Sequence, residues 1–219
     1  MSRWQWVQRT QPSRFWRFAS PLLALFLTVL LAMLLFVALG KDPWQGLQVF
    51  FWEPIKSGYA WGELLLKATP LLLIGLGLAL CFRSNVWNIG AEGQFIAGAI
   101  AAGSVALTAD ADTGRWIVLP ILLAGMAGGM AWAGIAAWLR DRFHASEILV
   151  SLMLVYVAEQ VLGWLVGGPL KDPMGYNFPQ SKTFEAATQI PLLFAGSRLH
   201  IGLLLALVGV AVLWVFLFR

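Results

Sequence analysis

The chain has 219 residues, of which 59% are hydrophobic and only 12% are charged. Charged residues are about half as frequent as in an ordinary soluble domain, and a single soluble core would not bury so much apolar surface. We therefore predict an all-α, polytopic integral membrane protein. The net charge of +4 indicates no nucleic-acid partner, because the arginines lie mostly in short segments between apolar runs, where they act as topology signals.

Residues 1–20 are basic and aromatic and contain no acid, a composition typical of the cytoplasmic interface of a membrane. We expect a cytoplasmic N-terminal segment over 1–20 and a transmembrane domain over 21–219. The first apolar run, 22–39, is either a signal peptide or a retained span. We favour the span, because the run is longer than the apolar core of a usual signal peptide.

Five more apolar runs follow, each near the length of about 20 residues that spans a bilayer. They cover residues 64–82, 86–107, 116–139, 148–166 and 200–218. The connection 40–63 mixes acids and bases, as expected of an outer loop, and its aromatic part 44–52 is expected to lie in the membrane interface. The connection 167–199 is rich in proline, which argues against a regular helix. The density of arginine in the short loops favours a cytoplasmic N-terminus and about six crossings.

The most unusual stretch begins the third run, where polar side chains and glycines interrupt an apolar context. Its polar side chains are Asn85, Asn88, Glu92 and Gln94. Such groups are costly at membrane depth and mark functional sites by default. One interpretation is a helix that is broken or re-entrant near Gly90, with its freed backbone groups buried in protein or lining a watery cavity. The other is an unbroken helix in which the amides satisfy one another. Asn85 is expected to cap the helix that follows.

Small residues predict where the helices pack closely. The fourth run contains the pattern Gly125-xxx-Gly129, and the third run offers Gly90, Gly93, Ala97 and Ala101. Glycine and alanine at such spacing let two membrane helices approach each other. We expect contacts between helices at these positions.

A short charged turn, expected on the cytoplasmic side, joins the fourth and fifth spans. Its prominent side chains are Arg140, Arg142, Phe143, His144 and Glu147. Ser146 is expected to cap the fifth span, and Glu147 lies where a helix N-terminus favours an anion. The turn is either a docking surface for another protein or a simple solvated turn.

Glu159 lies about 18 Å along the helix from Glu147, at 1.5 Å per residue. A carboxylate at that depth marks a transport path or an ion pair by default, and the alternative is a position near the outer end that reaches water. The sequence has no Walker loop, HExxH, GxSxG or Cys/His cluster. We therefore predict neither a catalytic site nor a metal site.

Three segments resemble a known family in order and spacing. They are KATPLLLIGLGLALCFRSNVWNIGAEGQFIAG from Lys67, ASEILVSLMLVYVA from Ala145 and GGPLKDPMGYNFPQS from Gly167. They look like the permease subunit of an ABC importer of the branched-chain amino acid/ribose type, in the simple-sugar and nucleoside branch that works with a BMP-type lipoprotein. Val155 departs from the pattern, since relatives usually carry Asn there. Relatives are also longer, so the chain resembles their N-terminal portion.

The resemblance implies a permease of the bacterial plasma membrane that pairs with a second permease subunit, identical or different. It implies two cytoplasmic ATPase subunits, which bind ATP and Mg, and no cofactor on this chain. An extracytoplasmic binding lipoprotein would deliver a simple sugar or nucleoside to the segment 167–181. The turn 140–147 would contact the ATPase. The side chains on or beside the substrate path would be Asn85, Asn88, Glu92 and Gln94, to which we add Glu159.

Two other functions stay open. One is an ion-coupled carrier or channel that uses Glu92 and Glu159 as a relay, and it predicts transport without an ATPase. The other is an inactive, truncated permease. The polar residues between Asn85 and Gln94 either contact the substrate or hold the broken helix together.

Overall fold

The computed structural model describes residues 13–219, so most of the basic N-terminal segment lies outside the described residues. By its internal contacts the chain divides into two units, with the boundary between Leu64 and Leu65. Regular structure in the described part is helical, apart from two isolated β-bridges. This confirms the all-α fold class.

The described part of the first unit holds α1, α2, a set of tight turns and the start of α3. Helix α1 spans Arg14–Ala38, and α2 spans Pro43–Leu47. A π-helical turn at Gln48–Trp52 and a 3-10 turn at Glu53–Ile55 follow. Asp42 caps α2, because its carboxylate accepts from the backbone N–H groups of Trp44 and Gln45. Helix α1 begins earlier than the apolar run and crosses the predicted boundary at residue 20, with Pro21 in its interior.

The second unit holds most of α3, which spans Gly58–Arg83 and begins before the boundary. The other helices are α4 at Ala91–Ala106, α5 at Val118–Phe143, α6 at Glu147–Gly167 and α7 at Gly202–Phe218. A 3-10 turn at Arg115–Ile117 leads into α5, and another at Ala186–Thr188 lies in the connection between α6 and α7. Helices α6 and α7 match the predicted runs to within two residues. The other bounds differ more: α3 begins at Gly58 and not at 64, α4 begins at Ala91 and not at 86, and α5 ends at Phe143 and not at 139.

Four helices in the described part are long and apolar enough to cross a bilayer: α1, α3, α5 with its preceding 3-10 turn, and α6. Helices α4 and α7 are shorter, with 16 and 17 residues. A span needs about 17–25 residues. Six crossings would therefore require α4 and α7 to span the membrane as well. Helix α4 is preceded by the non-helical residues 84–90.

The end of α3 corrects the expectation for Asn85. The N–H of Val86 donates to the carbonyl of Cys81 over 2.8 Å, and the N–H of Asn85 donates to the carbonyl of Phe82 over 3.1 Å. These two bonds form a Schellman motif. Asn85 takes the left-handed position in this motif, with φ of 56°. It therefore ends α3, whereas Gly90 occupies the N-cap of α4.

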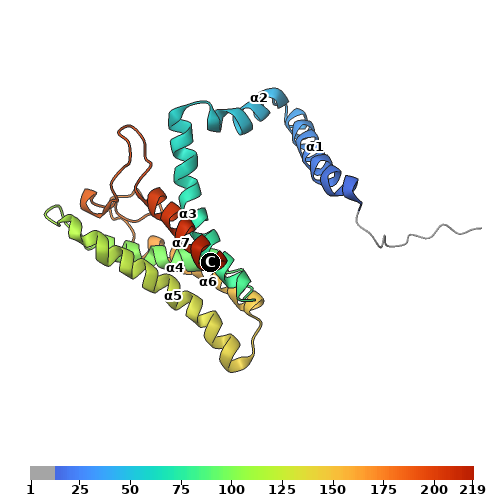
Figure 1. Ribbon diagram of the computed structural model, residues 1–219. Coiled ribbons are helices and arrows are strands. Elements are labelled where there is room, and N and C mark those ends of the chain that lie inside the picture. Colours follow the sequence, from blue (N-terminus) through green and yellow to red (C-terminus); the bar gives the residue numbers. More distant parts are fainter. Residues whose placement is uncertain (1–12) are drawn as a thin grey trace, which may run out of the picture. The chain divides into compact units, whose positions relative to one another are not determined.

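Helix α4 packs closely against α5 through glycine and alanine, as Figure 1 shows for the two neighbouring helices. A Cβ added to Gly128 would lie 2.7 Å from the Cβ of Ala101, and one added to Gly98 would lie 2.9 Å from the carbonyl oxygen of Gly125. The backbone of Gln94 approaches Gly129 in the same way. The predicted packing at the glycine pattern of α5 is confirmed.

Helix α4 also packs against α6. A Cβ at Gly93 would lie 3.0 Å from the Cα of Val155. The indole N–H of Trp132 on α5 donates to the carbonyl of Leu154 over 3.2 Å, which ties α5 to α6 beside this contact. Val155 is buried, so an apolar side chain fills this position against α4.

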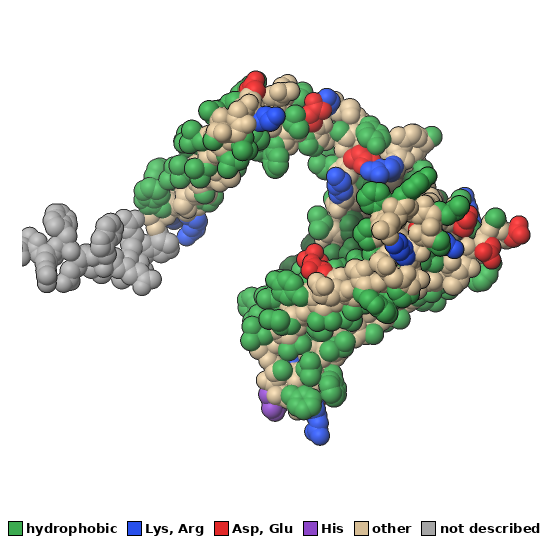
Figure 2. Space-filling view, turned by 180° about the vertical axis from the view of Figure 1, so that it is seen from behind, with side chains coloured by type: hydrophobic (Ala, Val, Ile, Leu, Met, Phe, Trp, Pro, Cys, Tyr) green, Lys and Arg blue, Asp and Glu red, His purple; other side chains and the backbone are tan. Residues whose placement is uncertain are grey.

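The residues buried between the helices are small or of medium size, and no large side chain in the described part is fully buried. Large apolar side chains instead point outward along α1, α3, α5, α6 and α7. Figure 2 shows hydrophobic side chains over most of the helix surface in that view. Such an apolar exterior is what a lipid environment stabilises.

Candidate functional site

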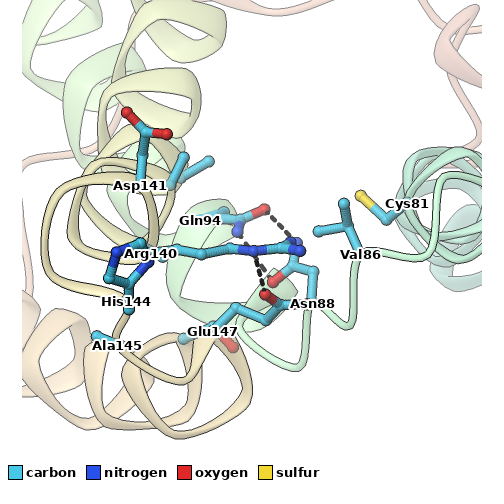
Figure 3. Close-up of a pocket in the computed structure, with 13 residues that line it drawn as sticks. Cys81, Val86, Asn88, Gln94, Arg140, Asp141, His144, Ala145 and Glu147 are labelled. Atoms are coloured by element: carbon cyan, nitrogen blue, oxygen red, sulfur yellow. Dashed lines mark hydrogen bonds and ion pairs between the residues drawn. The ribbon is translucent and has the colours of Figure 1, made fainter.

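A cavity of about 620 Å³ lies in the second unit, where α5 ends and α6 begins. Its walls come from the end of α3, the non-helical segment before α4, the first turn of α4, the last three turns of α5 and the first two turns of α6. The lining residues are Cys81, Val86, Asn88, Gln94, Ala133, Ala136, Ala137, Arg140, Asp141, His144, Ala145, Glu147 and Ser151. In Figure 3, Asp141 and His144 lie on one side of the cavity, and Cys81 and Val86 lie on the other.

The two amides of the central stretch bind each other inside this cavity (Figure 3). The Nδ2 group of Asn88 donates to Oε1 of Gln94, and Nε2 of Gln94 donates to Oδ1 of Asn88, both over 3.2 Å. Asn88 Oδ1 also accepts from the N–H of Gly90 over 2.9 Å. Each amide nitrogen keeps one hydrogen, and Oε1 of Gln94 keeps one lone pair. The pair can therefore still hydrogen-bond another polar molecule.

The stretch before α4 has one feature of each interpretation given above: the helix is broken near Gly90, and the amides are paired with each other. The chain is not helical before Ala91, and the amides do satisfy each other. Two backbone N–H groups of the non-helical segment donate hydrogen bonds to side chains that lie far away in the sequence. The N–H of Trp87 donates to Oε1 of Glu147 over 3.0 Å, and the N–H of Ile89 donates to Oγ of Ser151 over 3.2 Å.

Glu147 uses both of its carboxylate oxygens. Oε2 lies 2.7 Å from Nε of Arg140, while Oε1 accepts from Trp87. The side chain of Glu147 is 17% exposed and that of Arg140 is 46% exposed. Figure 3 shows Arg140 reaching from α5 towards Glu147. Ser146 occupies the N-cap position of α6, but its side chain makes no capping bond to the described residues.

Ser151 is a site residue that sequence reasoning missed. It is only 3% exposed, it lines the cavity, and its hydroxyl donates to the carbonyl of Ile148. One signal was available: Ser151 lies four residues after Glu147, so both side chains lie on one face of the helix.

The cavity is lined by some residues of the predicted substrate path and some of the predicted ATPase contact. Asn88 and Gln94 of the predicted substrate path lie beside Arg140, His144 and Glu147 of the predicted ATPase contact. Five predicted residues do not line it, and all five are exposed: Asn85, Glu92, Arg142, Phe143 and Glu159.

Glu92 lies in the first turn of α4 and Glu159 near the middle of α6. Neither carboxylate has a hydrogen-bond or ion-pair partner among residues 13–219. The lining of the cavity combines two amides, one hydroxyl, charged side chains and small apolar side chains. Such a lining suits the reversible binding of a small polar molecule.

Comparison with known proteins identifies relatives among transport permeases. The chain is 36% identical over 220 residues to the glucose ABC transporter permease protein TsgB13 of Haloferax volcanii, covering 95% of this chain and 57% of the relative. It is 30% identical to the guanosine ABC transporter permease protein NupP of Bacillus subtilis, covering 89% and 56%. It is 27% identical to the nucleoside ABC transporter permease protein NupB of Lactococcus lactis, covering 88% and 55%.

The chain thus spans a little over half the length of these relatives. No solved structure matches it significantly. The sequence profile described as "Branched-chain amino acid transport system / permease component" matches residues 61–219, which include α4, α5, α6 and the whole cavity. The chain therefore belongs to this family of multi-pass transport permeases.

Proposed function

We propose that this chain is the membrane subunit of an ABC importer that carries a simple sugar or a nucleoside. In this proposal it lies in the plasma membrane with its N-terminus in the cytoplasm. Partner subunits bind ATP and Mg and hydrolyse ATP, and a second permease subunit completes the path. The names of the relatives, which specify glucose, guanosine and nucleosides, support this substrate class.

The observation that carries the proposal is the amide pair in the cavity. Asn88 and Gln94 keep two N–H donors and one acceptor free, which matches the hydroxyl groups of a sugar or a ribose. The cavity volume of about 620 Å³ falls in the usual range of about 300–1,000 Å³ for small-molecule sites. Asn85, Glu92 and Glu159 lie outside the cavity and belong to the proposed path at other levels.

The proposed ATPase contact is the turn between α5 and α6. It presents Arg142, Phe143 and His144 as exposed side chains, and charged and aromatic groups on a short ordered turn suit docking of a soluble subunit. His144 ends α5 in the left-handed conformation, with φ of 53°, which turns the chain sharply and keeps the exposed turn compact.

The proposed contact for the binding lipoprotein is the segment 167–181. A β-bridge between Lys171 and Ser181 closes its base. At its tip Met174 is 85% exposed and Tyr176 is 94% exposed. Exposed Met and Tyr side chains are frequent at protein interfaces.

The first experiment is co-purification with the partner ATPase, followed by ATPase measurements in nanodiscs with and without a loaded binding protein. Glucose-loaded and guanosine-loaded proteins form the two arms. Stimulation in either arm supports the importer, and the arm identifies the substrate. A stable chain that captures no ATPase contradicts the proposal. Uptake that follows an ion gradient without ATPase would instead identify an ion-coupled carrier.

A further inference from the structure

The non-helical segment before α4 is held by side chains from a distant helix. Trp87 and Ile89 donate their backbone N–H groups to Glu147 and Ser151, which are about sixty residues away in the chain. The two acceptors lie four residues apart on α6, a rise of about 6.0 Å. Two residues of extended chain rise about 6.6 Å, so the donor and acceptor spacings match.

The backbone of the non-helical segment also packs closely against the backbone of α6. A Cβ at Gly90 would lie 2.6 Å from the carbonyl oxygen of Ser151, so the segment and α6 are packed against each other without a gap. Asn88 lies between the two bonded residues, and its amide lines the cavity. A movement of the first turns of α6 must therefore move Asn88.

Glu147 connects this segment to α5 as well. Its second oxygen pairs with Arg140, and the short turn between α5 and α6 joins the two helices directly. The carboxylate is mostly shielded from water, and a charged hydrogen bond in such surroundings is stronger than one in bulk water.

We infer that Glu147 and Ser151 form a clamp that transmits movements of the α5–α6 turn to the amide pair of the cavity. The inference rests on the proposed function, in which the turn contacts the ATPase and the amides contact the substrate. The clamp itself rests on the hydrogen bonds alone. Glu147 and Ser151 are thus positioning residues, because they act on the cavity through the segment they hold.

Ser151→Ala is the sharper test, because Ser151 lies outside the proposed ATPase contact. The change removes the acceptor of Ile89 and little volume. Glu147→Gln is the second variant: it removes the charge and replaces one of the two carboxylate oxygens by an NH2 group, which donates and cannot accept. Either Trp87 or Arg140 therefore loses the oxygen that it faces in the wild type. The matched controls are Ser104→Ala, whose hydroxyl donates within α4, and Glu53→Gln, whose carboxylate pairs with Lys56.

Two measurements are made on each permease in nanodiscs with its ATPase: hydrogen exchange of the amides of Trp87 and Ile89, and stimulation of the ATPase by the loaded binding protein. We expect exchange to accelerate about tenfold or more when the acceptor is lost. For Ser151→Ala we expect the ATPase to stay bound and its stimulation to fall about fivefold or more, as for the loss of an allosteric coupling. Both controls should match the wild type.

Unchanged exchange in Ser151→Ala would overturn the clamp. Faster exchange with full stimulation would overturn the transmission, because the segment would be released without effect on the ATPase. A wild-type chain that captures no ATPase would overturn the proposed function and the transmission with it. The exchange rates of Trp87 and Ile89 would still decide whether the clamp exists.

Discussion

Replacing Gly90 by alanine should destabilise the second unit, because the new methyl group has no space. Its carbon would lie 2.6 Å from the carbonyl oxygen of Ser151 and 2.8 Å from the Cβ of Ser151. A relaxed C···O contact is about 3.3 Å, so the segment must retreat by about 0.7 Å. The bond from Ile89 to Ser151, now 3.2 Å, would then lengthen to about 3.9 Å, which is beyond hydrogen-bond range.

The magnitude follows from three contributions. Overpacking costs about 1–3 kcal/mol, and the lost hydrogen bond costs about 0.5–1.5 kcal/mol. Alanine has a lower backbone entropy than glycine in the unfolded chain, which stabilises the folded state by about 0.4–1 kcal/mol. The free energy of unfolding should therefore fall by about 0.5–4 kcal/mol.

The measurement is unfolding in mixed micelles by titration with SDS, followed by tryptophan fluorescence and circular dichroism. The matched control is Gly163→Ala within α6, where an added Cβ would meet no described atom within 4 Å beyond its chain neighbours and the adjacent backbone of its own helix. Alanine is favoured over glycine in a helix by up to about 1 kcal/mol, so this control should be neutral or stabilising. Equal stability of Gly90→Ala and the wild type, or an equal loss in both variants, would refute the packing argument.

Three further predictions concern polar side chains. Asn85→Ala should lower the free energy of unfolding by about 1 kcal/mol, because alanine disfavours the left-handed conformation. Asn85→Gly should leave the stability unchanged, since glycine adopts this conformation readily. A loss of uptake in the stable glycine variant would place the amide on the substrate path. In a double-mutant cycle, Asn88→Ala and Gln94→Ala should show a coupling of about 1 kcal/mol in unfolding, and additive effects would contradict the reciprocal bonds. Trp132→Phe should cost about 0.5–1.5 kcal/mol by removing the bond to Leu154, and an unchanged unfolding midpoint would contradict it.

The helices of this fold were predictable because each is a long apolar run, and length is the dominant constraint in a bilayer. The predicted start of α4 was wrong by five residues, and this difference changes the candidate site. Residues 86–90 are apolar enough to continue a helix, and nothing local shows that Glu147 and Ser151 accept their N–H groups. Such acceptors lie about sixty residues away, beyond the reach of any local pattern.

The cap at Asn85 was misassigned for a related reason. Asparagine is favourable both at a helix N-cap and in the left-handed position that ends a helix. The sequence around it offered both possibilities, since α3 ends just before it and a helix follows. The bond from Val86 to Cys81 decides between them, and it depends on the three-dimensional path of the chain.

The candidate site was predictable in part. The amides Asn88 and Gln94 and the charged turn 140–147 stood out as polar groups in an apolar sequence. Their meeting in one cavity was not predictable, because it depends on how far α5 extends past the start of α4. Ser151 escaped notice since one serine in a membrane helix is common and carries no charge.

The close packing of α4 on α5 has a consequence for temperature. Separating these helices inside a bilayer would expose glycine and alanine to lipid chains and not to water. The large heat-capacity change that accompanies apolar hydration would then be nearly absent. The association should keep a similar strength from cold to warm conditions, because its strength comes from the fit of two backbones and not from the exclusion of water.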